Sequence, residues 1–165
     1  MDLELLKNIA LLLGITDFLV YVSYIWGRYG VQKSISISVY DLPVKYQYTF
    51  RFFVWILSAA IILAGIGWGS SIFLISGSLL SLVGFFCHIK TKWKYHIHMV
   101  GAIGGILTCF AGIMWMSSTL GLVVGGLIIV EALLCYLFVD KKHFIWNVEI
   151  ISFANLMGSL LLLNY

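Results

Sequence analysis

The chain has 165 residues, of which 62% are hydrophobic and 10% are charged, and its mean hydropathy is +1.04. Soluble domains carry about 25% charged residues, so this sequence has too little polar surface to cover a water-facing globule. The formal net charge of +3 is small and its carriers are scattered, which argues against a nucleic-acid surface. The length fits a single transmembrane domain, residues 1–165, without a separate soluble domain.

Six segments are long and apolar enough to cross a bilayer as helices. A spanning helix needs roughly 20 mainly apolar residues, because each residue rises 1.5 Å through about 30 Å of hydrocarbon. In chain order, the segments that qualify are about 5–26, 49–67, 70–88, 95–116, 119–139 and 144–163. We therefore expect an all-α, polytopic integral membrane protein whose six transmembrane helices form one bundle.

The one long connection is the first loop, residues 27–47, which contains the single proline, Pro43. Within it, residues 34–39 read Ser-Ile-Ser-Ile-Ser-Val, so polar and apolar residues alternate. A period of two predicts a short extended or interfacial segment, with one face on protein or lipid and the other in water.

Basic residues are unevenly distributed between the two ends of the predicted bundle. Very short connections at 67–70 and 116–119 force antiparallel neighbours, so three loops share one side, here called the basic face: 27–47, 89–94 and 140–143. Nine of the ten Lys and Arg belong to it: Arg28, Lys33, Lys45, Arg51, Lys90, Lys92, Lys94, Lys141 and Lys142. Because short basic loops resist translocation, we expect the basic face to be cytoplasmic, in a plasma membrane, with both termini outside.

Several ionisable residues lie inside the predicted spans. A charged side chain costs at least about 2.5–3.5 kcal/mol at the bilayer centre, so such residues usually face the bundle interior and pair. With the antiparallel topology, all of them fall at the midplane or in the half nearer the basic face: Asp17, Arg51, His98, Glu131 and Glu149. We predict that these five line one polar cavity, open or gated toward the basic face.

Three uses of such a cavity stay open. Buried ion pairs, for instance Arg51 with Glu149 or Asp17, would only fix the helix register. A binding site would take the head group of a membrane lipid or a polar solute, and this non-catalytic function is the leading expectation. An intramembrane lipid-modifying enzyme would use His98 with a carboxylate as acid and base. A small transporter or ion conductor is the remaining class, but the other half of the bundle has no visible polar exit.

The sequence predicts neither a metal site nor a cofactor. His96 and His98 lie two residues apart, so on a helix their side chains point about 200° from each other and cannot share one ion. No zinc-ligand spacing, catalytic serine motif or phosphate-binding glycine loop is present. The cysteines lie in or beside apolar segments and are expected to be buried thiols: Cys87, Cys109 and Cys135.

Glycines recur at the four-residue spacing that lets transmembrane helices approach closely. The pairs are Gly65/Gly69, Gly101/Gly105 and Gly121/Gly125. They predict close packing within one chain or, alternatively, the seam of a homo-oligomer.

Three stretches carry a resemblance to a known group: residues 31–40 in the first loop, 48–51 at the opening of the second segment and 98–102 at the start of the fourth. Together they resemble the small six-helix membrane proteins of the DRAM/Frag/Sfk group and its uncharacterised bacterial and phage relatives. Those proteins carry a Ser-Ile-Ser-Asp-like motif in the first loop and a His-x-x-Gly-Ala-like motif later. The resemblance implies a role in lipid handling or membrane organisation, and cytoplasmic termini. By position, it marks four residues of interest: Ser34, Ser36, Asp41 and His98.

Overall fold

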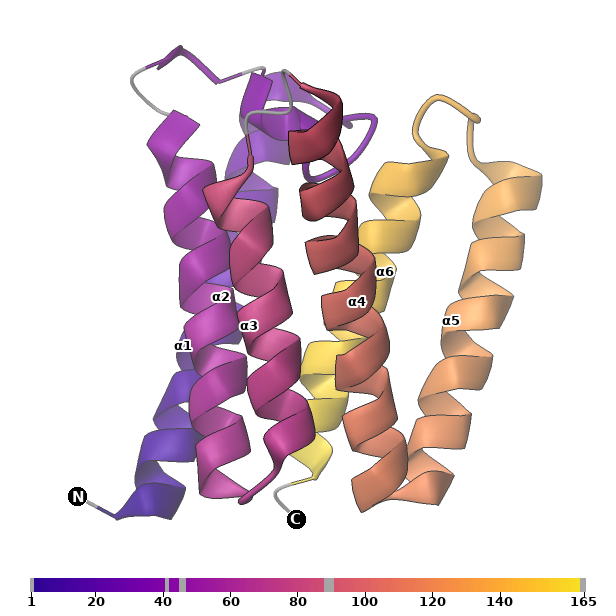
Figure 1. Cartoon of the computed structure of the whole chain (residues 1–165). Coiled ribbons are helices and arrows are strands. Elements are labelled where there is room, and N and C mark those ends of the chain that lie inside the picture. The colour runs from indigo at the N-terminus through magenta and orange to yellow at the C-terminus, as the bar shows by residue number, and fades with distance from the viewer. Residues whose placement is uncertain (1, 41, 45–46, 88–90, 164–165) are drawn as a thin grey trace.

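The computed structural model describes residues 2–40, 42–44, 47–87 and 91–163, and within them it is all-helical without a strand (Figure 1). The elements in chain order are α1 (Leu3–Tyr29), the 3-10 helix η1 (Ile37–Tyr40), α2 (Gln47–Gly67), α3 (Ser71–Phe85), α4 (Lys92–Met116), α5 (Ser118–Phe138) and α6 (Phe144–Leu162). The prediction of an all-α fold with six α-helices is therefore confirmed for the described residues, and all predicted helix ends, those of α3 included, lie within three residues of the observed ones.

The six helices run up and down, with both termini at the end of the bundle opposite the three loops of the basic face (Figure 1). Helices α1 to α4 pack in succession, whereas α5 stands at the edge and touches α4 and α6 (Figure 1). Five of the helices are long and apolar enough to cross a membrane, and α3 is the exception. The α1–α2, α3–α4 and α5–α6 connections lie at one end of the bundle, and the α2–α3 and α4–α5 connections lie at the other, as antiparallel pairing requires.

Helix α3 is shorter than the sequence predicted. The apolar segment 70–88 was expected to be one span, but α3 ends at Phe85 after 15 residues, which is about 22 Å of helix. The backbone leaves the helical region at Phe86, with φ −109° and ψ 35°. Cys87 thereby enters the core, where its Sγ accepts a hydrogen bond from Arg51 Nε at 3.1 Å. Hydropathy alone does not reveal this break, because the chain stays apolar beyond it.

The first loop is not extended over residues 34–40, so the extended form of that prediction is wrong, and the interfacial alternative stays a prediction. Within residues 34–40 the buried residues come in pairs four apart, Ser34 with Ile35 and Ser38 with Val39, and a turn leads into η1. The N–H of Ser38 donates to the carbonyl of Ser34 at 3.2 Å, and the Ser38 hydroxyl bonds to the Ile35 carbonyl and, at 2.8 Å, to Tyr21. Because serine hydroxyls satisfy local backbone groups, alternation of polarity here does not separate a wet face from a dry one.

Helix α3 lies in close contact with α2 and α4 through glycines. A Cβ at Gly77 would lie 2.7 Å from the carbonyl oxygen of Ser58, and one at Gly101 would lie 2.7 Å from that of Leu79. Of the predicted glycine pairs, the members that pack against other side chains of this chain are Gly65, Gly101, Gly105, Gly121 and Gly125. Gly69 instead forms the α2–α3 turn, with φ +62°. These glycines serve packing within the chain, and the homo-oligomer stays a prediction.

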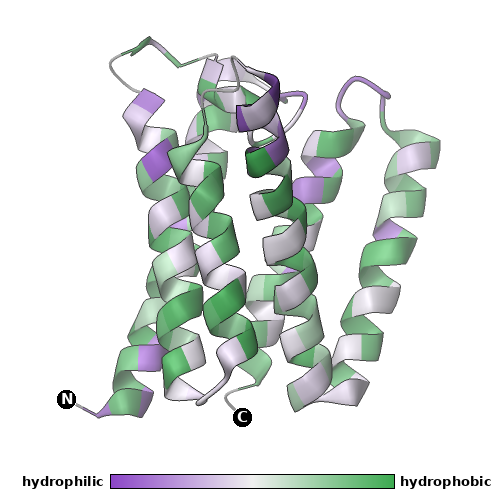
Figure 2. Cartoon of the chain, in the orientation of Figure 1, coloured by the Kyte–Doolittle hydropathy of each residue, from purple (hydrophilic) through white to green (hydrophobic). Residues whose placement is uncertain are grey.

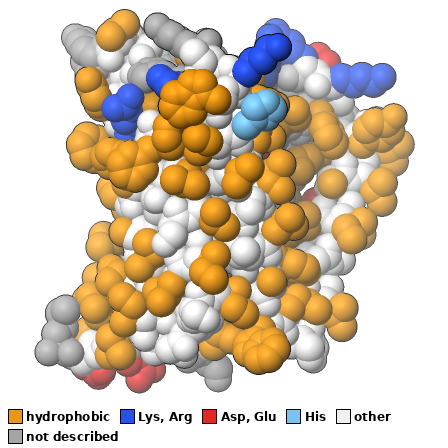
Figure 3. All heavy atoms as spheres, viewed as in Figure 1, with side chains coloured by type: hydrophobic (Ala, Val, Ile, Leu, Met, Phe, Trp, Pro, Cys, Tyr) orange, Lys and Arg blue, Asp and Glu red, His pale blue; other side chains and the backbone are white. Residues whose placement is uncertain are grey.

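Polar and apolar residues are separated along the bundle axis. Hydrophilic residues concentrate at the loop end (Figure 2), and Lys and Arg side chains gather at the same edge above a largely hydrophobic side surface (Figure 3). Lys45 and Lys90 lie outside the described residues. At the other end, Lys7 is only 7% exposed and its Nζ lies 5.6 Å from the centre of the Trp68 ring. The side surface of the bundle is thus mainly apolar, as a protein surrounded by an apolar solvent requires.

Candidate functional site

A cavity of about 590 Å³ lies near the basic face, between α4, the start of α6 and the first loop. Its wall includes Ile103 of α4 and Ile145 of α6, which are 51% and 55% exposed on the side of the bundle. The cavity therefore opens sideways onto the apolar outer surface. Ala102 and Ile106 also border a narrower space of about 40 Å³ that reaches inward from it.

The upper rim of the cavity is cationic. Lys33 comes from the first loop, and Lys141 and Lys142 come from the α5–α6 connection. Tyr95 joins them from the first turn of α4. Polar groups thus lie at one end of the cavity and aliphatic side chains along its length.

The first loop is held against α6 by two hydrogen bonds. Glu149 Oε2 accepts the backbone N–H of Ile35, and His143 Nδ1 lies 3.2 Å from the carbonyl oxygen of Gln32. This attachment places Ser34 and Ser36 on the cavity wall. The Glu149 carboxylate, which would be costly inside a span without a partner, therefore accepts a hydrogen bond from the backbone of the first loop.

His98 lines the cavity and is only 1% exposed. Its ring contacts the backbone of Val83 and Phe86. Its Nδ1 is buried and has no hydrogen-bond partner among the described residues. Since buried polar atoms are nearly always hydrogen-bonded to protein, water or ligand, this nitrogen is a candidate contact for a bound molecule.

His96 is exposed while His98 is buried, as expected for helical residues two apart. Within the described residues, no group of three or more His, Cys, Asp or Glu side chains is placed to hold a metal ion. The three cysteines are free and buried, as predicted.

The structure brings together four of the residues singled out in the sequence: Ser34, Ser36, His98 and Glu149. Asp17, Arg51 and Glu131 are not among the residues that line this cavity, so the prediction of one cavity lined by all five ionisable residues is wrong. Asp41 lies outside the described residues. Depth along a helix was predicted from the sequence, but the direction in which each side chain points around the helix was not.

The three excluded residues have separate surroundings. Arg51 bonds to Cys87 and lies over the Tyr48 ring, 5.3 Å from its centre, rather than pairing with Glu149 or Asp17. Glu131 accepts a hydrogen bond from Asn155 Nδ2 between α5 and α6. Asp17 lies on α1, and its Oδ2 is buried with no hydrogen-bond partner among the described residues.

The sequence reasoning missed the rim lysines and Tyr95 as site residues. In the sequence, the lysines indicate only the topology of the chain, and no motif marks Tyr95. The available signal was that the loops 27–47 and 140–143 share the basic face, which allows their lysines to meet.

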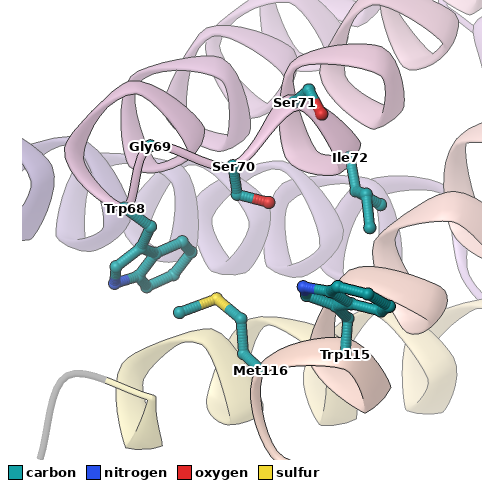
Figure 4. Close-up of a pocket in the computed structure, with 7 residues that line it drawn as sticks. All are labelled: Trp68, Gly69, Ser70, Ser71, Ile72, Trp115 and Met116. Atoms are coloured by element: carbon teal, nitrogen blue, oxygen red, sulfur yellow. The ribbon is translucent and has the colours of Figure 1, made fainter.

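A second cavity, of about 320 Å³, lies at the opposite end of the bundle (Figure 4). It is formed by the α2–α3 turn and the end of α4, with Trp68, Trp115 and Met116 around Ser70 and Ser71 (Figure 4). Trp115 is 81% exposed, and no residue that lines the cavity is titratable. An exposed tryptophan at a helix end, such as Trp115, is typical of a membrane interface, so this cavity is the weaker candidate.

Comparison with protein-family models, with curated proteins and with solved structures found no significant match. The resemblance to the DRAM/Frag/Sfk group therefore rests on its motifs alone and stays a prediction.

Proposed function

We propose that this protein crosses a membrane six times and binds a lipid in the cavity between α4, α6 and the first loop, without altering it chemically. One observation carries the proposal: the cavity has a polar rim at the level of the basic face and an aliphatic wall that opens sideways, where acyl chains would be. A lipid has the same sequence of polar head and apolar chain. A freely diffusing polar solute would leave the aliphatic wall unused.

In this proposal α3 also crosses the bilayer, because it lies between α2 and α4 and contacts both along its length. A short span is accommodated by local thinning of the bilayer at modest cost. The basic face lies in the cytoplasm, as the excess of Lys and Arg in short loops predicts. The bound lipid would then belong to the cytoplasmic leaflet.

The buried polar groups have a matching use. His98 lies about one helical turn further from the basic face than Tyr95 on α4, toward the depth where a lipid head joins its acyl chains through ester groups. A hydrogen bond to His98 Nδ1 would satisfy the atom that lacks a partner among the described residues.

The test is to fill the cavity from its wall. Ala102 lines it and is partly buried, so Ala102→Phe should occupy the space and expel the ligand. Ala111→Phe is the matched control, since Ala111 is exposed on the same helix and does not line the cavity. Each variant is purified in mild detergent, and the co-purified lipid is measured by mass spectrometry. We expect Ala102→Phe to lose at least tenfold more lipid than the control; equal lipid in both would contradict the proposal.

The second candidate is an intramembrane enzyme that acts on a lipid. It is favoured by one observation, that His98 and Glu149 line the same cavity. Against it, Glu149 is already engaged by the backbone of Ile35. Turnover of the co-purified lipid in the wild type, lost in His98→Ala while the lipid still binds, would support this candidate. Unchanged lipid after long incubation would remove it.

A further inference from the structure

We propose that the lipid bound in this cavity is an anionic phospholipid, whose head group carries a phosphate and no positively charged group. This inference rests on the proposed function and adds the chemical class of the ligand. It follows from the charges, the helix ends and the hydroxyl groups that surround the rim.

The charges at the rim all have one sign. Lys33, Lys141 and Lys142 line the cavity and come from the two loops of the basic face. Glu149 is the one lining acid, and the Ile35 N–H occupies its Oε2. The nearby Asp140 accepts the backbone N–H of Lys142 at 3.0 Å within the α5–α6 turn and is not a lining residue. An anion entering the rim therefore meets three ammonium groups, and the one acid in the described lining, Glu149, is held by the backbone of the first loop.

The two helices that line the cavity both begin at this end. The positive end of a helix dipole is its N-terminus, and α4 starts at Lys92 and α6 at Phe144. Their N-cap residues, Thr91 and His143, make no side-chain capping hydrogen bond. The first-turn N–H groups thus add to the positive potential of the lysines instead of being neutralised by a cap.

Hydroxyl groups complete the donor set. Ser34 Oγ accepts the N–H of Ile37 at 3.1 Å, which leaves its own proton available to donate. Ser36 and Tyr95 line the same cavity from the loop and from α4. Charge-assisted hydrogen bonds to phosphate oxygens are among the stronger polar interactions in proteins. A choline head group would instead bring a further cation to the lysines, with no carboxylate at the rim to receive it.

The experiment measures lipid binding by native mass spectrometry of the full chain in nonionic detergent. The probes are dioleoyl phosphatidylglycerol, which is anionic, and dioleoyl phosphatidylcholine, which has the same chains and no net charge. We expect the anionic lipid to bind the wild type at least tenfold more tightly. The double variant Lys141→Gln/Lys142→Gln should lose affinity for phosphatidylglycerol by about 30-fold, since each lysine near an anionic head group contributes about fivefold. Its affinity for phosphatidylcholine should not change.

The matched control is Lys92→Gln/Lys94→Gln, which removes two charges from the first turn of α4 on the same face, at positions that do not line the cavity. It should keep the preference of the wild type; an equal loss in the control would overturn the cavity as the origin of selectivity. Equal binding of the two lipids by the wild type would overturn the proposal that the ligand is anionic and would leave the proposed function intact. Binding of neither lipid would count against the proposed function itself. Excess inorganic phosphate should not displace phosphatidylglycerol, and displacement would show that the site takes free phosphate instead of a lipid.

Discussion

The two halves of the bundle are packed differently. In the half formed by α1 to α4, glycines bring backbones together, and a Cβ at Gly77 would lie 2.7 Å from the Ser58 carbonyl oxygen. In the half formed by α4 to α6, Gly121 and Gly125 of α5 pack against Met114 and Phe110 of α4, but a Cβ at Gly126 would meet nothing within 4 Å. The most apolar stretch of α2 is 50% buried, whereas that of α5 is only 17% buried. We call α1 to α4, where the helices are closely packed, the closed half, and α4 to α6, where they are loosely packed, the open half.

Polar groups follow the same division. In the closed half, the Ser76 hydroxyl of α3 donates to the Gly105 carbonyl of α4 at 2.7 Å, and the Ser58 hydroxyl donates to that of Val54 at 2.7 Å. In the open half, the His98 ring has an unpartnered Nδ1 among the described residues, and the rim lysines face a cavity. Close packing of α3 on α2 and α4 leaves no room for a ligand along these interfaces, so the closed half acts as a scaffold for the open one.

The largest expected effect is in the closed half. Gly77→Val should lower the free energy of unfolding by about 3 kcal/mol, the upper end of the cost of overpacking, because backbone atoms of α2 block the new side chain. Unfolding is followed as sodium dodecyl sulfate replaces nonionic detergent. Gly126→Val on α5 is the control and should change stability by less than about 1 kcal/mol. Equal losses would mean that the halves do not differ in packing.

An intermediate effect is expected where the first loop closes the open half. Glu149→Leu leaves the buried N–H of Ile35 without an acceptor, which should cost about 2 kcal/mol relative to Glu149→Gln, whose amide oxygen can still accept. Hydrogen–deuterium exchange at the Ile35 amide should be faster in the Leu variant. Identical exchange in the two variants would show that this hydrogen bond does not hold the loop.

The smallest effect is expected at the outer edge of the open half. Glu131 and Asn155 form the hydrogen bond between α5 and α6. A double-mutant cycle with Glu131→Leu and Asn155→Leu should give a coupling of about 0.6 kcal/mol, the average for hydrogen bonds between helices in a bilayer. A coupling several times larger would mean that α5 depends on this pair more than its sparse packing indicates.

Much of the fold could be predicted from local sequence. Five helices and the antiparallel order follow from segment length and from connections such as 67–70 and 116–119, because a helix in an apolar solvent satisfies its own backbone. The break at Phe86 could not be predicted, because the chain stays apolar beyond it. The helical turn of the first loop could not be predicted either, because hydropathy does not report where serine hydroxyls bond to nearby backbone. The convergence of Ser34, His98 and Glu149 was predicted in part, from their common depth.

The sequence by itself determined that the chain is helical, that its helices alternate in direction and that its cations collect at one end, since these depend on hydropathy along the chain. Only the tertiary structure decided which ionisable groups share a cavity. The rotation of each helix about its axis is set by contacts between helices, such as that of Gly101 with Leu79, and these contacts join residues distant in sequence. That rotation turned His98 and Glu149 into the open half, Arg51 toward Cys87 and Glu131 toward Asn155.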